Sequence, residues 1–291
     1  MPIFLNQFLL LLIVAVAAGA LGSLLGLGGG IIIVPVMTLF LHIDFRTAAG
    51  ASIIAVIATS SGSASAYVKD GLANIRVGMF LEILTTLGAI CGALLVGRFR
   101  GSILYVVFAL ALMYSLVPSG RRILEELRGR PRKLERRDSA GSGRLALGLS
   151  LGGSYFDPAL GRQVEYRLRR VPLGAAIMYG AGLASGLLGI GSGVFKVLAM
   201  DSVMGMPIKS STATSNFMIG VMAAASAGIY FGRGDINPFV AAPVALGVLA
   251  GSLLGATILP RITGVKIRIF FFAVIAVIGA QMLLRGLRGG A

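Results

Sequence analysis

Two glycine-rich interruptions of long apolar runs are the features of this sequence best suited to chemistry. They are Gly26–Gly30 and Gly189–Gly193. Glycines at the start of a short helix leave backbone N–H groups uncovered, and the helix dipole attracts an anion to that end. Close packing of helices on small residues is the alternative reading. Because interruptions at matching positions of two repeats are typical of transporter binding sites, we expect an anion site here.

Lys196 follows the second interruption inside an apolar stretch, where a cation is costly unless it is paired or used. We expect this side chain to hold the anion. Two alternatives stay open: Asp201 could neutralise it, or its ammonium group could reach the membrane interface. The equivalent position after the first interruption is Ile33, so the expected pocket is asymmetric.

Glu82 and Asp201 are the acids that lie well within apolar stretches. The proton affinity of a buried carboxyl depends on its neighbours, as proton coupling requires. We therefore expect these two residues to be the candidates for proton coupling, with Glu82 the better one. The alternative for Glu82 is a paired structural carboxylate near the headgroups, because it lies close to the start of its helix.

Two further cations, Arg46 and Lys209, each lead directly into a run rich in small and hydroxyl side chains. Ser215 and Asn216, in the second run, can donate hydrogen bonds to oxyanion oxygens. Membrane helices also use such side chains to bond one another, and the two cations could equally mark the membrane interfaces. We expect these four residues to line the path of the anion.

Catalytic and metal chemistry have little support in this sequence. It contains a single histidine, His42, and a single cysteine, Cys91. A thiolate metal site, a disulfide framework and a histidine cluster are therefore excluded, and no catalytic triad is evident. The sequence contains neither a nucleophile elbow nor an H-E-x-x-H arrangement. We expect no enzyme activity, no cofactor and no metal site.

The composition places these residues in a membrane. The 291 residues are 56% hydrophobic and only 13% charged, with a mean hydropathy of +0.91, whereas a soluble domain keeps a more polar shell. The net charge of +15 is concentrated, because half of the 26 Lys and Arg residues lie between Ser119 and Val171. The positive-inside bias makes this segment a cytoplasmic loop near anionic headgroups, and nucleic-acid binding is the weaker reading.

The chain also contains an internal duplication. One constant shift along the sequence aligns the first glycine-rich interruption with the second. Without a gap, the same shift aligns Tyr67 with Tyr230 and Asn74 with Asn237. The first apolar run therefore has an internal counterpart, and we expect a retained helix there and not a signal peptide. The expected units are a first transmembrane repeat at 1–118, a basic linker at 119–171 and a second transmembrane repeat at 172–288.

The expected fold is an all-α polytopic membrane protein with about four transmembrane helices and one short half-helix in each repeat. The half-helices Ile31–Leu41 and Val194–Met204 are too short for the ~30 Å hydrocarbon core. The expected spans are Ile3–Leu25, Thr47–Val68, Val77–Val96, Ser102–Val117, Pro172–Leu188, Ser210–Phe231, Phe239–Leu259 and Ile267–Leu284. Parallel and inverted repeats both stay open. Alternation around Asp157–Gly161 predicts a small cytoplasmic β-hairpin in the linker.

Two motifs carry a resemblance to a known family. Gly26–Pro35 is a glycine-rich break followed by an apolar run and a proline, and Gly189–Gly193 leads to Ser211–Asn216. With the duplication, they resemble the sulfite exporter TauE/SafE family of transport permeases over nearly the whole chain. The resemblance implies transport of sulfite, thiosulfate, organosulfonates or related organic anions. Ser192 and Lys196 depart from the first copy, so equal roles for the two half-sites do not follow.

We therefore expect a secondary transporter in the plasma membrane of a prokaryote, which moves a small anion, such as sulfite or another sulfur oxyanion or sulfonate, by alternating access. The expected anion ligands are Gly28, Gly29, Gly30, Gly191, Ser192, Gly193, Lys196, Ser215, Asn216, Arg46 and Lys209. An anion channel, or a non-transporting scaffold that recruits a partner through the basic linker, is the alternative. The expected partners are the substrate and the lipid bilayer, without nucleic acid, and the sequence sets no oligomeric state.

Overall fold

The computed structural model describes residues 2–39, 41, 43–95, 151–188 and 192–287, with isolated positions between 106 and 124. Gly191, His42, most of the predicted span Ser102–Val117 and residues 125–150 of the basic linker lie outside the described residues.

The described part of the chain is mainly helical. Its first half forms α1 (Pro2–Leu25), α2 (Gly30–Leu39), α3 (Phe45–Lys69) and α4 (Ile75–Leu95). Its second half forms α7 (Val171–Leu188), α8 (Gly193–Leu198) with a π-helical turn (Ala199–Val203), α9 (Ile208–Gly232), α10 (Pro238–Ile258) with a 3-10 turn (Leu259–Arg261), and α11 (Gly264–Leu287). The short elements α2 and α8 lie where half-helices were predicted.

Several of these helices suit a lipid environment. α3, α4, α9 and α10 are long and apolar enough to cross a membrane, and α1 and α7 include shorter apolar stretches. Large apolar side chains such as Leu94, Phe239 and Leu246 are exposed on the protein surface. In lipid such side chains need no cover, and a helix satisfies its own backbone polar groups. The architecture is that of an all-α membrane protein.

The helix bounds follow the internal shift seen in the sequence. That shift carries both ends of α3 onto the ends of α9, and both ends of α4 onto the ends of α10. Tertiary contacts repeat in the same way: the Tyr67 hydroxyl donates to the Ser23 carbonyl at 3.1 Å, and the Tyr230 hydroxyl donates to the Gly186 carbonyl at 3.1 Å. The duplication and the domain limits stay predictions from the sequence.

The two equivalent helices α3 and α9 run antiparallel to each other. Ser60 of α3 donates to the Asn216 carbonyl of α9 at 2.6 Å. Ile53, earlier in α3, instead lines a cavity together with Ala223, which comes later in α9. Since equivalent helices of parallel repeats would point the same way, this packing favours the inverted arrangement that the sequence left open.

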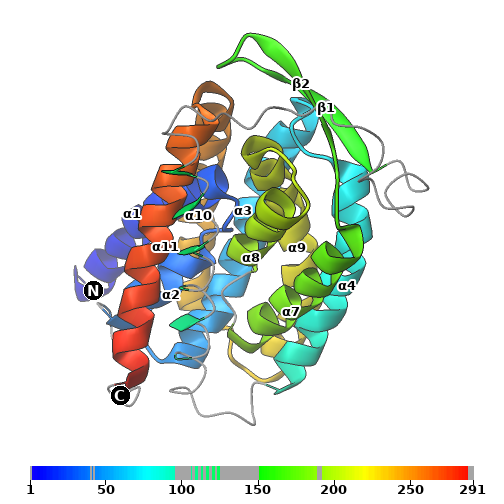
Figure 1. Ribbon diagram of the computed structural model, residues 1–291. Coiled ribbons are helices and arrows are strands. Elements are labelled where there is room, and N and C mark those ends of the chain that lie inside the picture. Colours follow the sequence, from blue (N-terminus) through cyan, green and yellow to red (C-terminus); the bar gives the residue numbers. More distant parts are fainter. Residues whose placement is uncertain are drawn as a thin grey trace.

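Each first helix packs against the other half of the chain, α1 on α10 and α7 on α4 (Figure 1). Glycines make the α4–α7 crossing close. A Cβ added at Gly88 would overlap the Tyr179 carbonyl, and one added at Gly186 would overlap the Ala89 carbonyl. Small residues at a crossing allow backbones to approach, which is a principal source of helix association in lipid.

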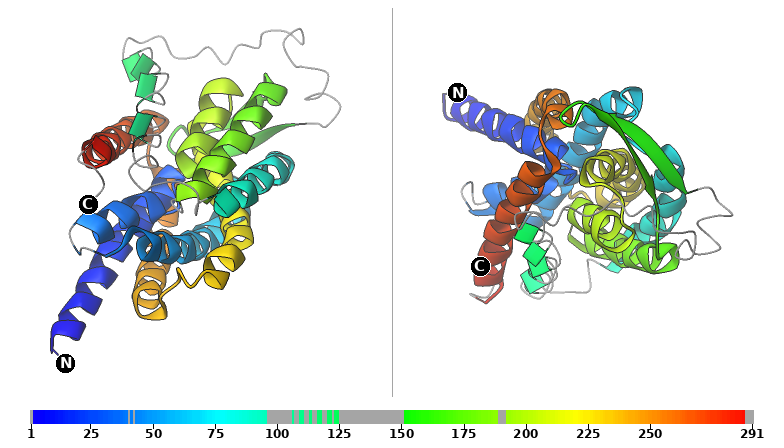
Figure 2. Two further views of the ribbon diagram at one scale, coloured as in Figure 1. Left: turned by 90° about the horizontal axis from the view of Figure 1, so that it is seen from below. Right: turned by 45° about the horizontal axis from the view of Figure 1, so that its top comes forward.

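The predicted β-hairpin is confirmed. β1 (Gly152–Asp157) pairs antiparallel with β2 (Arg162–Arg167), and the hairpin lies across one end of the helices (Figures 1 and 2). Tyr166 on its buried face shares a hydrogen bond with the Ser210 hydroxyl at 3.0 Å, and Asn74 at the start of α4 donates to the Gly152 carbonyl at 3.0 Å. The hairpin thereby joins the first turns of α4 and α9.

Candidate functional site

The first interruption is a reversal of the chain that requires glycine. Gly26, Gly28 and Gly29 have φ values of 72°, 78° and 68°, in the left-handed region that other residues enter only with strain. The Gly28 carbonyl accepts a hydrogen bond from Thr59 Oγ1 at 3.3 Å. These conformations turn the chain from the end of α1 into the start of α2.

The two interruptions meet inside the protein. A Cβ added at Gly193, the first residue of α8, would overlap the carbonyl oxygen of Gly26. The Ser215 hydroxyl joins both segments, because Oγ lies 2.8 Å from the Gly26 carbonyl oxygen and 3.5 Å from that of Gly193. The structure thus brings together the described residues of both predicted half-sites.

This meeting point is tightly packed in the conformation seen here. A Cβ at Gly28 would lie 2.6 Å from Ile219 Cδ1, and one at Gly22 would overlap the amide nitrogen of Gly29. Asn216 Nδ2 donates to the Ser23 carbonyl at 2.7 Å and to the Thr212 carbonyl at 3.2 Å. The helices must therefore separate, and these side chains must change partners, before an anion can reach the glycine amides.

Lys196 and Glu82 form a buried ion pair beside this crossing. Lys196 Nζ lies 2.9 Å from Glu82 Oε2, and the two side chains are 0% and 6% exposed. Thr86, one turn further along α4, donates to the other carboxylate oxygen at 3.1 Å. The predicted anion ligand and the better predicted proton carrier are therefore one electrically neutral unit.

Both alternatives for Lys196, a pair with Asp201 and a position at the membrane interface, are wrong. Asp201 does not pair with Lys196 but lies 2.9 Å from Arg268 Nη2 at the start of α11. The interface alternative is also wrong, because the Lys196 side chain is fully buried. A buried ion pair contributes little net stability, yet removal of one partner typically costs about 3–5 kcal/mol.

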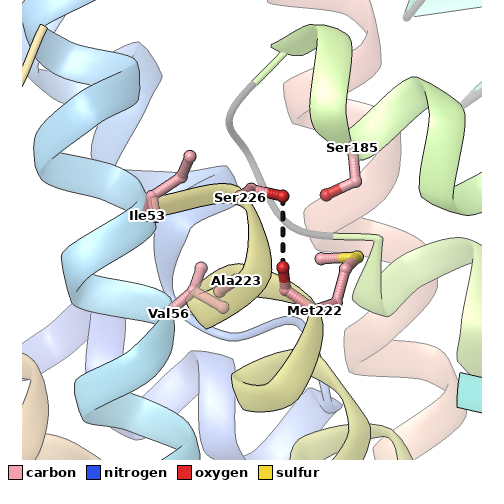
Figure 3. A pocket seen from close by; sticks show the side chains of 6 residues that line it. All are labelled: Ile53, Val56, Ser185, Met222, Ala223 and Ser226. Atoms are coloured by element: carbon pink, nitrogen blue, oxygen red, sulfur yellow. Dashed lines mark hydrogen bonds between the residues drawn. The ribbon is translucent and has the colours of Figure 1, made fainter. Parts of the chain in front are cut away.

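A small cavity lies between α3, α7 and α9 (Figure 3). Its volume is about 10 Å³, room for a single water molecule. It is lined by Ile53, Val56, Ser185, Met222, Ala223 and Ser226. Met222 connects it to the start of α8, because its sulfur accepts a hydrogen bond from Ser192 Oγ at 3.2 Å.

Three other predicted site residues lie elsewhere. Lys209 is buried under the hairpin, 2.6 Å from Asp157 Oδ1 and 3.1 Å from the Pro260 carbonyl oxygen. Arg46 is exposed at the start of α3, and its backbone amide donates to the Asp44 carboxylate at 2.9 Å. With Asp201 in its pair with Arg268, none of the three contributes a described contact to the glycine crossing.

The Tyr166 hydroxyl, which joins the hairpin to the helices, stays neutral at ordinary pH. Burial raises the pKa of the Tyr166 hydroxyl, while its bonds to Ser210 and Asn74 oppose that shift less strongly. The hydroxyl therefore remains a neutral hydrogen-bonding group between the hairpin and the helices.

Sequence reasoning missed Thr86, Ser185, Ser226 and Met222. Thr86 carries a readable signal, because a hydroxyl four residues after a buried acid lies on the same helix face. The other three come from α7 and α9, and they converge only through tertiary packing. Among the described residues, no cluster of His, Cys, Asp and Glu could hold a metal ion.

Comparisons with known proteins agree with the membrane architecture. The family model described as "Sulfite exporter TauE/SafE" matches residues 11–282. "Probable membrane transporter protein YunE" of Bacillus subtilis is 28% identical, over 97% of this chain and 99% of its own. "Probable membrane transporter protein YdhB" of the same organism is 24% identical over 94% and 100%, and "Probable membrane transporter protein MJ0441" of Methanocaldococcus jannaschii is 24% identical over 97% of each chain. No solved structure matches significantly.

Proposed function

This chain belongs to the sulfite exporter TauE/SafE family of membrane transporters, and we propose that it carries a small anion, a sulfur oxyanion or a sulfonate such as sulfite, by alternating access. One observation carries the proposal: a fully buried cation, Lys196, sits on the short helix α8 beside the meeting point of two interrupted helices. A buried cation is costly and is retained in membrane proteins chiefly for function.

In this proposal, the anion replaces Glu82 as the partner of Lys196. Opening the glycine crossing would give it the amides of Gly28–Gly30, Ser192 and Gly193, which lie at the positive ends of two short helices. Gly191, outside the described residues, stays a predicted ligand. Ser215 and Asn216 would then exchange their backbone acceptors for the oxygens of the anion. Asn216 must present its amide nitrogen, because its Oδ1 would repel a negative charge.

Arg46 and Lys209 would make the first contacts with the anion on opposite sides. Each lies near the start of its helix, α3 or α9. Because these helices are antiparallel, their starts lie at opposite ends of the pair. Lys209 would first have to leave Asp157, so access at its end requires movement of the hairpin.

The inverted arrangement and the tight crossing support alternating access over a channel. Two oppositely oriented halves can exchange equivalent conformations, one open to each side. The closed packing around Gly28 is what an occluded carrier requires. We place the protein in the plasma membrane of a prokaryote with the linker, and hence the hairpin end, in the cytoplasm, following the positive-inside bias. Glu82 is the first candidate for proton coupling, and Asp201 is the second.

Transport by purified protein in proteoliposomes tests this function. Labelled methanesulfonate should enter vesicles preloaded with unlabelled methanesulfonate, because a carrier exchanges substrate across the membrane. Lys196→Met should lower the exchange rate by about tenfold or more, since a charge-assisted contact to the anion is lost. Lys69→Met, at an exposed lysine at the end of α3, is the matched control and should retain exchange.

Two results would contradict the proposal. Exchange that is unchanged in Lys196→Met removes this residue from the anion site. Flux far faster than a carrier allows, without counterflow, would instead identify a channel.

A further inference from the structure

The charge of the proposed site is balanced in a way that constrains its cargo. Lys196 supplies one positive charge and Glu82 one negative charge, and both side chains are buried. The pair is neutral while it is closed. Any anion that takes the place of the Glu82 carboxylate on Lys196 changes this balance unless another charge moves with it.

Among the residues that the structure describes, no other charged side chain lies close enough to Lys196 or Glu82 to compensate such a change. α7, which packs on α4, has no Asp, Glu, Lys or Arg between Val171 and Leu188, and its Tyr179 is exposed near Cys91 on the outer face. The charged residues of α9 lie at its two ends: Lys209 pairs with Asp157, and Arg233, which follows the helix, pairs with Asp235. Beyond α8, Asp201 pairs with Arg268.

Resting on the proposed function, we infer that Glu82 is a built-in competitor of the substrate, so that the protein carries one singly charged anion together with one proton. A proton from the water on the open side binds Glu82 Oε2 as that oxygen leaves Lys196. The anion then pairs with Lys196, and the site again has no net charge. Release reverses both steps on the other side, so no bond other than the carboxyl O–H forms or breaks.

The geometry around Glu82 suits this exchange. Thr86 Oγ1 donates a hydrogen bond to Glu82 Oε1, whereas Lys196 contacts the other carboxylate oxygen, Oε2. The protonated carboxyl can therefore keep its Thr86 bond while Oε2 releases the lysine. Ser192, at the start of α8, lies next to the position that the anion would take.

This charge balance selects the class of substrate. A monoanion such as hydrogensulfite or an alkyl sulfonate restores neutrality together with one proton. A dianion such as sulfate or thiosulfate would leave one uncompensated negative charge in a buried site, which is strongly unfavourable. The site should therefore accept monoanions and reject dianions of similar size.

Wild-type protein in proteoliposomes gives the decisive measurement, with methanesulfonate and sulfate as probes. A one-unit pH difference is a tenfold proton ratio, so methanesulfonate should accumulate about tenfold on the alkaline side. A potential imposed with potassium and valinomycin should leave this accumulation unchanged, because the cycle moves no net charge. Sulfate should enter at least about tenfold more slowly than methanesulfonate.

The variant Glu82→Gln separates the carboxylate from the rest of the site. Its methanesulfonate exchange should persist without a pH dependence, and its net uptake should now respond to the potential. Asp70→Asn, at an exposed carboxylate after α3, is the control and should behave as wild type. A loss of folding in Glu82→Gln leaves the wild-type measurement intact.

The outcomes distinguish this inference from the function on which it rests. Flux that responds to the potential in wild-type protein, or sulfate uptake equal to that of methanesulfonate, overturns the inference and leaves anion transport standing. Absence of flux of any anion under every gradient, in protein that is folded, overturns the proposed function and the inference with it.

Discussion

Replacing Lys196 by Met removes the cation from the buried pair while keeping a side chain of similar length. Glu82, only 6% exposed and 2.9 Å from the lost ammonium group, would be left as an unpaired carboxylate. Thr86 still donates to its other oxygen, but a single hydroxyl does not replace a charge.

The magnitude follows from the burial of both partners. Removal of one partner of a buried pair costs about 3–5 kcal/mol, because the other charge stays uncompensated. The second single variant, Glu82→Met, should lose a similar amount for the converse reason. Replacement of both charges by apolar side chains removes the uncompensated charge, so the double variant should fall within about 1 kcal/mol of wild type.

A double-mutant cycle measures this coupling. The midpoint of thermal unfolding of purified protein in detergent would be compared for wild type, both single variants and the double variant. We expect each single variant to unfold at a clearly lower temperature and the double variant to recover most of the loss. If the two single losses instead add in the double variant, the residues act independently, and the reasoning about a coupled neutral pair is refuted.

Three further predictions concern packing and the hairpin. Gly186→Ala should destabilise the protein by about 1–3 kcal/mol, because its Cβ would overlap the backbone of α4. Gly180→Ala, with open space around it, should leave the unfolding temperature unchanged or higher. Equal effects of the two substitutions would contradict the close crossing of α4 and α7. Lys209→Met should loosen the hairpin and speed hydrogen exchange of the β1 and β2 amides, whereas Arg162→Met, at an exposed position, should not. Equal exchange rates in the two variants would show that Lys209 does not hold the hairpin on the helices. The raised pKa of Tyr166 means that the folded state favours the neutral hydroxyl. The stabilisation that this hydroxyl provides should be complete below about pH 10 and decline above it. Thermal unfolding of wild type and of Tyr166→Phe across that pH range measures this difference.

Local sequence signals located most of the helices correctly. Apolar runs of sufficient length, bounded by glycine, proline or charged residues, predicted α3, α4, α9 and α10 to within one turn of the bounds seen in the structure. The half-helices and the hairpin were also predicted from the sequence. Each of these features depends on residues that are neighbours in sequence, which is why periodicity and punctuation suffice to find them.

The partners of the buried charges were not readable in this way. Lys196 and Asp201 are close in sequence, which made them an obvious pair, but residues five apart do not share a helix face. The true partner of Lys196 is Glu82 on α4, and that of Asp201 is Arg268 on α11. Such pairings depend on how distant helices approach, and no local pattern encodes that.

The sequence by itself indicated a helical membrane protein with matching motifs in its two halves, two glycine-rich interruptions and a lysine beside one of them. Only the tertiary structure decided that the equivalent helices α3 and α9 run antiparallel, that the interruptions meet, and that Lys196 is already neutralised by Glu82. The physical reason is that hydrophobicity and glycine act over a few residues. Helix direction and charge pairing are set by contacts between segments far apart in the chain.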